Sequence, residues 1–164
     1  MADLLIVRHG ESEWNAAGRW QGWADPPLSP KGEDQATAAA VELAGLRLEA
    51  IAASDLQRAR RTAEIITAEL ELGDVHVDVG LRERNVGDFS GLTRHEIEAR
   101  WPGMLAEWRS GRAQQAPGGE GPEFLERVLA ALDRVADRFA GQRVLVVAHG
   151  GLIRTVHRHL GGEP

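Results

Sequence analysis

Residues 4–15 read LLIVRHGESEWN, and residues 144–151 read VLVVAHGG. In both stretches an apolar run leads to a histidine followed by glycine. Short continuous runs of Val, Ile and Leu are typical of strands that are buried on both faces of a parallel sheet. We therefore expect two buried strands, with His9 at the carboxyl end of one and His149 at the carboxyl end of the other.

The chain between these runs alternates between predicted strands and helices. Further strands are predicted for residues 51–53 and 75–79. Helices are predicted to start where a Ser or Thr precedes a helical apolar pattern, because the hydroxyl can cap free backbone N–H groups. The predicted helices cover residues 30–46, a segment opened by a capping box at 54–57, a segment from 93 to 101, and residues 124–139. Residues 111–122 are rich in Gly, Gln and Pro and are predicted to form a loop.

Strands that alternate with helices predict right-handed crossovers and a mostly parallel sheet covered on both faces. The predicted fold class is therefore α/β, a three-layer α/β/α sandwich. With 164 residues the chain has the length of one domain, and we expect a single domain over residues 1–164. Ligands of open parallel sheets bind beyond the carboxyl ends of the strands, so His9 and His149 are expected to share one cleft.

Composition excludes several classes of chemistry. The chain has no cysteine, which rules out disulfides, thiolate metal sites and a cysteine nucleophile. Its net charge of −6 disfavours nucleic acid as a partner. The sequence shows no membrane segment, and its first residues are too acidic, with too short an apolar run, for a signal peptide, so a cytoplasmic location is expected. The remaining catalytic groups are His, Ser/Thr, carboxylates and Arg.

Five motifs in order give the chain a specific resemblance. The sequence resembles the histidine phosphatase superfamily, the phosphoglycerate mutase-like proteins, over almost its whole length. The matching blocks are RHGES at 8–12 with Asn15, LSPKG at 28–32, SDLQRA at 54–59, LRE at 81–83 with GDFSG at 87–91, and VVAHGG at 146–151. The resemblance implies a phosphoglycerate mutase-like fold and phosphoryl transfer.

The resemblance also assigns roles to five residues. His9 is expected to attack phosphorus and carry the phosphoryl group, because a neutral imidazole is a good nucleophile. Arg8 and Arg58 are expected to hold the phosphoryl oxygens, since the planar guanidinium bonds two oxygens and stays charged. His149 is expected to donate a hydrogen bond to the same oxygens. Glu83 is expected to act as general acid and base.

Further residues are expected to contact the substrate or to pack near it. The resemblance implies substrate contacts by Asn15, Gln21, Gly22 and Gly150, besides Arg8, Arg58 and His149, and Arg84 is predicted to contact a group beyond the phosphate. Arg154 and Asn85 could also reach a group beyond the phosphate. Trp14, Trp20 and Trp23 are compatible with either pocket lining or core packing. The other histidines, His76, His95, His157 and His159, have no motif support and are interpreted as surface or helix residues.

Two other classes of function must be weighed. His9, His149 and Glu83 could form a two-histidine, one-carboxylate metal site. Two arginines in the same pocket would repel a divalent cation, so no metal and no cofactor are expected. The chain could instead be a non-catalytic binding domain on the same fold. Such a domain would be expected to lose the nucleophile or an arginine, and this sequence keeps both.

Within the family, the resemblance favours hydrolysis over mutase activity. Mutases carry a longer insertion after the Glu-containing block, whereas here Gly91 leads directly to the helix at Thr93. Only 15 residues follow His149, so either the sequence is truncated or the C-terminal elements of the family are absent. The predicted activity is that of a metal-independent, histidine acid phosphatase-type phosphomonoesterase acting on sugar phosphates or phosphoglycerate-type esters. A phosphoglycerate mutase-type phosphotransferase is the alternative, and the sequence leaves a homodimer open.

Overall fold

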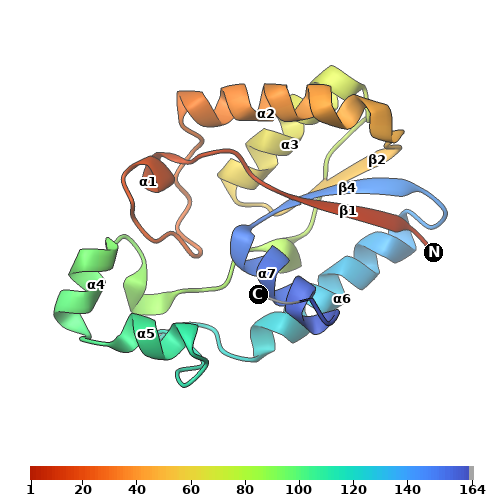
Figure 1. Ribbon diagram of the computed structural model, residues 1–164. Helices are drawn as coiled ribbons and strands as arrows, with labels where there is room; N and C mark the ends of the chain where they lie inside the picture. Colours follow the sequence, from red (N-terminus) through yellow and green to blue (C-terminus); the bar gives the residue numbers. More distant parts are fainter. Residues whose placement is uncertain (163–164) are drawn as a thin grey trace.

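The central sheet of the computed structural model, which describes residues 1–162, has four parallel strands (Figure 1). In chain order the strands are β1 (Asp3–Arg8), β2 (Ala50–Ala53), β3 (His76–Val77) and β4 (Arg143–Ala148), and their order in the sheet is β1-β4-β2-β3. Arg8 is paired with Ala148, and the backbone N–H of His9 donates to the carbonyl of Ala148 (3.0 Å). His9 and His149 therefore follow the ends of neighbouring strands.

Helices cover both faces of this sheet, which confirms the three-layer prediction (Figure 1). Helices α2 (Pro30–Leu43) and α3 (Gln57–Leu70) lie on one face, and α6 (Glu123–Arg138) and α7 (Gly150–His159) lie on the other. The apolar stripe of α6 is fully buried against the sheet at Phe124, Val128 and Val135. Apolar side chains are buried between the sheet and the helices on each of its two faces. This burial is the main contribution to the stability of the fold.

A third group of elements lies beyond the carboxyl ends of the strands (Figure 1). It comprises α1 (Glu13–Ala16), α4 (Arg94–Arg100), α5 (Met104–Arg109) and the 3-10 turn Gly87–Phe89; two more such turns, Ala44–Leu46 and Val79–Leu81, lie elsewhere in the chain. The group has its own apolar cluster, in which the Trp20 ring contacts Phe89 (5.8 Å between centroids) and Trp108 (5.4 Å). Trp20 is therefore a packing residue as well as a neighbour of the cleft.

Most element boundaries agree with the sequence-based expectations. One of them is the start of α4, where Thr93 forms the predicted capping box. One predicted cap is wrong. The Ser54 box does not open α3, whose N-cap is Leu56; instead, the Asp25 carboxylate, from a distant loop, accepts from the N–H of Gln57 (2.7 Å). The strand predicted over 75–79 is limited to His76–Val77, because the Asp78 side chain accepts from the N–H of Gly80 and starts a 3-10 turn.

None of the helices in residues 1–162 combines the length and apolar character needed to cross a membrane.

Candidate active site

His9 and His149 lie in contact at the ends of β1 and β4. Their ring centroids are 5.2 Å apart in an edge-to-face arrangement. His9 is 7% exposed to solvent, and His149 is fully buried. The Nδ1 atom of His9 lies 2.6 Å from the carbonyl oxygen of Gly10. Because a carbonyl can only accept, Nδ1 carries the proton, and the lone pair of Nε2 is left free.

Burial keeps both rings neutral. It lowers the pKa of His9 to about 3, against the opposing effect of the Gly10 hydrogen bond, and the charges of Arg58 and Arg8 lower it further. Burial also holds the pKa of His149 well below its ordinary value, again with a contribution from Arg58. Within residues 1–162 neither ring nitrogen of His149 has a hydrogen-bond partner. A neutral imidazole has one N–H donor, so His149 can donate to a bound oxyanion.

Arg58 is held by the loop that precedes α2. Arg58 is the second residue of α3, so it also lies where backbone N–H groups attract anions. Its Nη1 donates to the carbonyl of Ala24 and its Nη2 to that of Gly22, both at 2.8 Å. The side chain is 1% exposed, and burial lowers its pKa to about 10, which leaves it charged at neutral pH. The guanidinium is thus fixed before any ligand arrives.

The carboxylate of Glu83 lies against the first turn of α7. Its Oε2 accepts from the backbone N–H of Gly151 (2.9 Å), and its Oε1 accepts from that of Arg84 (2.8 Å). A side chain at position 151 would collide with both carboxylate oxygens, since a Cβ there would lie 3.0 Å from Oε2 and closer to Oε1. Gly151 is therefore required for this contact.

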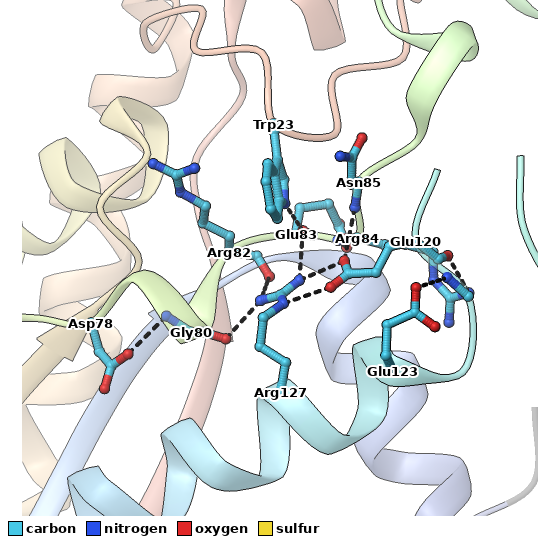
Figure 2. Close-up of polar contacts among 11 residues, drawn as sticks. Trp23, Asp78, Gly80, Arg82, Glu83, Arg84, Asn85, Glu120, Glu123 and Arg127 are labelled. Carbon is cyan, nitrogen blue, oxygen red and sulfur yellow. Dashed lines mark hydrogen bonds and ion pairs between the residues drawn. The ribbon is translucent and has the colours of Figure 1, made fainter. Parts of the chain in front are cut away.

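Arg127 of α6 holds the backbone of the segment that carries Glu83 (Figure 2). Its guanidinium donates to the carbonyls of Gly80 (2.8 Å) and Glu83 (3.2 Å) and makes a two-pronged ion pair with Glu120, with both N–O distances at 2.7 Å. The indole N–H of Trp23 donates to the same Glu83 carbonyl (2.8 Å). Trp23 and Arg127 therefore position the segment rather than the substrate.

A cavity of about 590 Å³ gathers most of the predicted site residues. The lining includes Arg8, His9, Asn15, Gln21, Gly22, Arg58, Glu83, Arg84, Gly150 and Arg154. His149 is absent from the lining because it is fully buried in contact with His9, and its direct contact with a phosphoryl oxygen stays a prediction. Asn85 does not line the cavity; its amide oxygen accepts from the N–H of Gly87 (2.9 Å).

Several outer residues are already engaged within the chain. The Asn15 amide oxygen accepts from the N–H of Ser12 (3.0 Å) as part of a capping box. The Ser12 hydroxyl contacts the Gln21 amide. The Arg84 guanidinium lies over the Phe124 ring (4.6 Å) and donates to the carbonyl of Gln114 (3.2 Å). These residues shape the cavity, and their contacts with a substrate stay predictions.

The cavity also contains residues that the sequence analysis missed. They are Gly18, Arg19, Val86, Leu105, Trp108, Arg109, Gly151, Thr155 and Arg158, whereas Trp20, which the sequence left between pocket lining and core packing, also lines the cavity. No motif marks α5, which contributes Leu105, Trp108 and Arg109. Arg158 follows Arg154 by four residues on α7, and this helical spacing is the one signal that could have found it. His76 is half-buried, and its ring centroid lies 5.8 Å from that of Phe139. It belongs to β3, the edge strand farthest from β1, which leads to His9.

The two-histidine, one-carboxylate metal site considered as an alternative has no matching geometry in the structure. Within the described part of the chain, no three His, Asp or Glu side chains are grouped so that they could hold a metal ion. His9, His149 and Glu83 therefore do not form the metal site considered above.

Known proteins are similar to this chain over almost its whole length. A family model described as histidine phosphatase superfamily (branch 1) matches residues 4–164. A 2,3-bisphosphoglycerate-dependent phosphoglycerate mutase from Methylobacterium radiotolerans is 39% identical over 97% of this chain and 79% of its own. A mycobacterial glucosyl-3-phosphoglycerate phosphatase superposes with a TM-score of 0.89 at 34% identity (98% and 81% covered), and a phosphoglycerate mutase from Bacillus anthracis with 0.84 at 31% (96% and 78%).

These likenesses confirm a phosphoglycerate mutase-like fold and correct one expectation. Histidine acid phosphatases belong to a different branch, so that description does not apply. Relatives named as mutases and as phosphatases match the chain comparably well, and both activities are compatible with the match. This protein is a member of branch 1 of the histidine phosphatase superfamily.

Proposed function

We propose that this protein hydrolyses small phosphomonoesters through a phosphohistidine on His9. The observation that carries the proposal is the hydrogen bond from Nδ1 of His9 to the Gly10 carbonyl, combined with the lowered pKa of the ring. Together they leave an unprotonated Nε2 in a cavity that also contains Arg8 and Arg58. Such a group can attack phosphorus while the arginines neutralise the charge on the phosphoryl oxygens.

The reaction would proceed in two steps. In the first, Nε2 of His9 forms a bond to phosphorus, the bond to the leaving oxygen breaks, and Glu83 gives that oxygen a proton. In the second, Glu83 takes a proton from water, which attacks phosphorus and breaks the P–N bond to release phosphate. Arg8, Arg58 and the N–H of His149 would stabilise the charge that builds on the equatorial oxygens in both steps.

Hydrolysis is favoured over mutase activity by the segment after Glu83. Gly91 leads within two residues to the Thr93 cap of α4, so the cavity receives no additional loop there. The mycobacterial structure that superposes with a TM-score of 0.89 is described as a phosphatase acting on glucosyl-3-phosphoglycerate. The expected substrates are sugar phosphates or phosphoglycerate-type esters. The mutase alternative is supported by the 39% identical Methylobacterium relative.

Rapid quenching with a radiolabelled phosphomonoester tests the intermediate. We expect an acid-labile, base-stable adduct on His9, and His9→Ala should abolish both the adduct and turnover. His149→Ala keeps the nucleophile and should cost on the order of 10²–10³ in rate, as for the loss of one oxyanion donor. Label trapped on His149, or full activity of His9→Ala, would contradict the mechanism.

The same preparation distinguishes hydrolase from mutase and tests the need for metal. Phosphate release from phosphoglycerate should exceed interconversion of its isomers, and a chelator should leave the rate unchanged. Faster interconversion than release would favour the mutase alternative. A loss of activity on chelation that added metal restores would contradict the expectation that only side chains stabilise the charge.

A further inference from the structure

The turn that follows His9 is held by a buried threonine outside the cavity lining. Thr62 lies on α3, one helical turn after Arg58, and is 2% exposed. Its hydroxyl oxygen lies 3.1 Å from the backbone nitrogen of Gly10 and 2.7 Å from the carbonyl oxygen of Arg58. One buried hydroxyl therefore joins the turn of the nucleophile to the helix that carries Arg58.

The direction of both hydrogen bonds follows from the groups involved. The N–H of Gly10 can only donate, so the Thr62 oxygen accepts from it. The carbonyl of Arg58 can only accept, so it receives the hydroxyl proton, as is common for a helical Thr and the residue four positions earlier. Because its one proton is already used, the hydroxyl has none to give to a substrate. Thr62 can therefore act on the reaction only through its neighbours.

Gly10 depends on this contact, because its backbone is buried between two helices. Among residues 1–162, the Thr62 hydroxyl is the one acceptor of the Gly10 N–H. On the other side, a Cβ at position 10 would collide with the carbonyl oxygen of Gly32 on α2. A buried N–H without an acceptor is unfavourable, so loss of the hydroxyl would favour a different conformation of the turn.

The same turn determines which ring nitrogen of His9 carries the proton. Nδ1 of His9 donates to the carbonyl of Gly10 (2.6 Å), and the partner of one ring nitrogen selects the tautomer of a neutral imidazole. Gly10 thus holds His9 through its carbonyl, while Thr62 holds Gly10 through its N–H. A rotation of the Gly10 backbone would move the carbonyl away from Nδ1 and remove the preference for an unprotonated Nε2.

We propose that Thr62 is a positioning residue for the nucleophile: by holding the Gly10 N–H, it keeps the Gly10 carbonyl at Nδ1 of His9 and Nε2 free to attack phosphorus. The proposal rests on the proposed function, because it assigns Thr62 to phosphoryl transfer through His9. The Arg58 guanidinium is held separately, by two carbonyls of the loop before α2. Loss of the Thr62 hydroxyl should therefore lower kcat and change KM little.

Substitutions at position 62 test this in steady-state kinetics with a phosphomonoester. Thr62→Val removes the hydroxyl and keeps the branched shape of the side chain. We expect kcat to fall about 10- to 100-fold, the effect of a small displacement of a reacting group. Thr62→Ser keeps the hydroxyl and should restore most of kcat. Thr62→Ala removes the same hydroxyl with a better helix former, and it replaces the valine variant if that protein does not fold.

Thr67→Val is the matched control on the same helix. The Thr67 hydroxyl also donates to a backbone carbonyl, that of Gly73, at 2.7 Å. Thr67 lies near the C-terminal end of α3 and does not line the cavity. Its substitution removes the same chemical group from the same helix and should leave kcat unchanged. A loss of kcat as large as that of Thr62→Val would overturn the proposal.

The tautomer of His9 is measured without substrate, which separates this proposal from the proposed function. Nitrogen-15 NMR distinguishes a protonated ring nitrogen from an unprotonated one, and the His9→Gln variant identifies the His9 signals. We expect the proton on Nδ1 in the unmodified protein, in Thr62→Ser and in Thr67→Val, and a shift of the proton toward Nε2 in Thr62→Val.

Unchanged His9 signals in Thr62→Val would overturn the proposal even if kcat falls, because the loss would then reflect general destabilisation. A proton on Nε2 in the unmodified protein would overturn it as well. The expected shift in Thr62→Val supports the positioning role even if no ester is hydrolysed, a result that would contradict only the proposed function.

Discussion

At the scale of single residues, Glu83 has backbone partners in the cavity wall rather than a partner in a surface ion pair. It lies between two arginines in the sequence, which leaves a surface ion pair as an alternative. In the structure its carboxylate is bonded instead to two backbone N–H groups, those of Arg84 and Gly151. The carboxylate is thus held in the cavity wall, and within residues 1–162 it makes no ion pair with a side-chain cation.

Glu83→Gln should therefore impair substrates according to their leaving groups. The amide keeps the shape of the side chain but cannot give up a proton. Alkyl phosphates need that proton in the transition state and should lose about 10²–10⁴ in kcat, the usual contribution of a general acid. p-Nitrophenyl phosphate, whose leaving group is stable as an anion, should lose far less. Steady-state rates on both substrates check this, and an equal loss would remove Glu83 from the acid role.

The motif residues were predictable, but their protonation was not. His9, His149 and Arg58 are recognisable because each lies in a block whose residue types suit phosphoryl transfer. That Nδ1 of His9 is bonded to Gly10 depends on the backbone conformation of a single turn, which the sequence does not encode in any pattern. The same holds for Arg58, whose two loop carbonyl partners lie 34 and 36 positions away.

At the scale of elements, α6 contributes to the site although none of its residues lines the cavity. Arg127, on the first half of this helix, donates to the carbonyls of Gly80 and Glu83 and pairs with Glu120. The pair is largely buried, with side-chain exposures of 22% and 11%. Loss of Arg127 would leave the Glu120 carboxylate without its ion-pair partner and would remove a donor from the Gly80 and Glu83 carbonyls.

Arg127→Gln should lower both stability and turnover. Breaking a largely buried ion pair costs about 3 kcal/mol, because the remaining partner is left uncompensated. Since Glu83 would be less precisely placed, kcat should fall more than KM rises. Arg134→Gln on the same helix is the matched control: it breaks an ion pair with Asp78 whose arginine is 55% exposed and should cost less than about 1 kcal/mol. Urea unfolding and steady-state kinetics measure both variants, and similar losses in the two would contradict this role.

The sequence predicts whether a segment is a helix or a strand better than it predicts the residue at which a helix starts. Apolar periodicity predicts α2, α3 and α6 because each buries one continuous face. The start of α3 was misplaced, since the cap comes from Asp25, a residue 32 positions away that no local pattern connects to Gln57. Helix α5 lies within residues that the prediction left between its last two helices, and it supplies the cavity wall with Trp108 and Arg109.

At the scale of the whole molecule, the site reduces stability at low pH. His9 and His149 are held neutral by burial, and their pKa values are lower in the folded protein than the ordinary value of about 6.5. Below that pH the unfolded chain binds protons that the folded protein does not. Stability is therefore complete above about pH 6.5 and falls as the pH decreases toward the folded pKa of His9, about 3.

We therefore expect a loss of stability between about pH 6.5 and pH 4.5, where most carboxylates are still ionised in both states. With about 1.4 kcal/mol per unit of pH, His9 alone should contribute on the order of 2–3 kcal/mol over this window, and His149 acts in the same direction. His9→Gln removes one of the two groups, so its free energy of unfolding should fall less than that of the unmodified protein over the same range. Urea unfolding at the two ends of the window gives the comparison. Equal losses in both proteins would mean that His9 binds protons alike in the folded and unfolded states, which would contradict the lowered pKa of the ring.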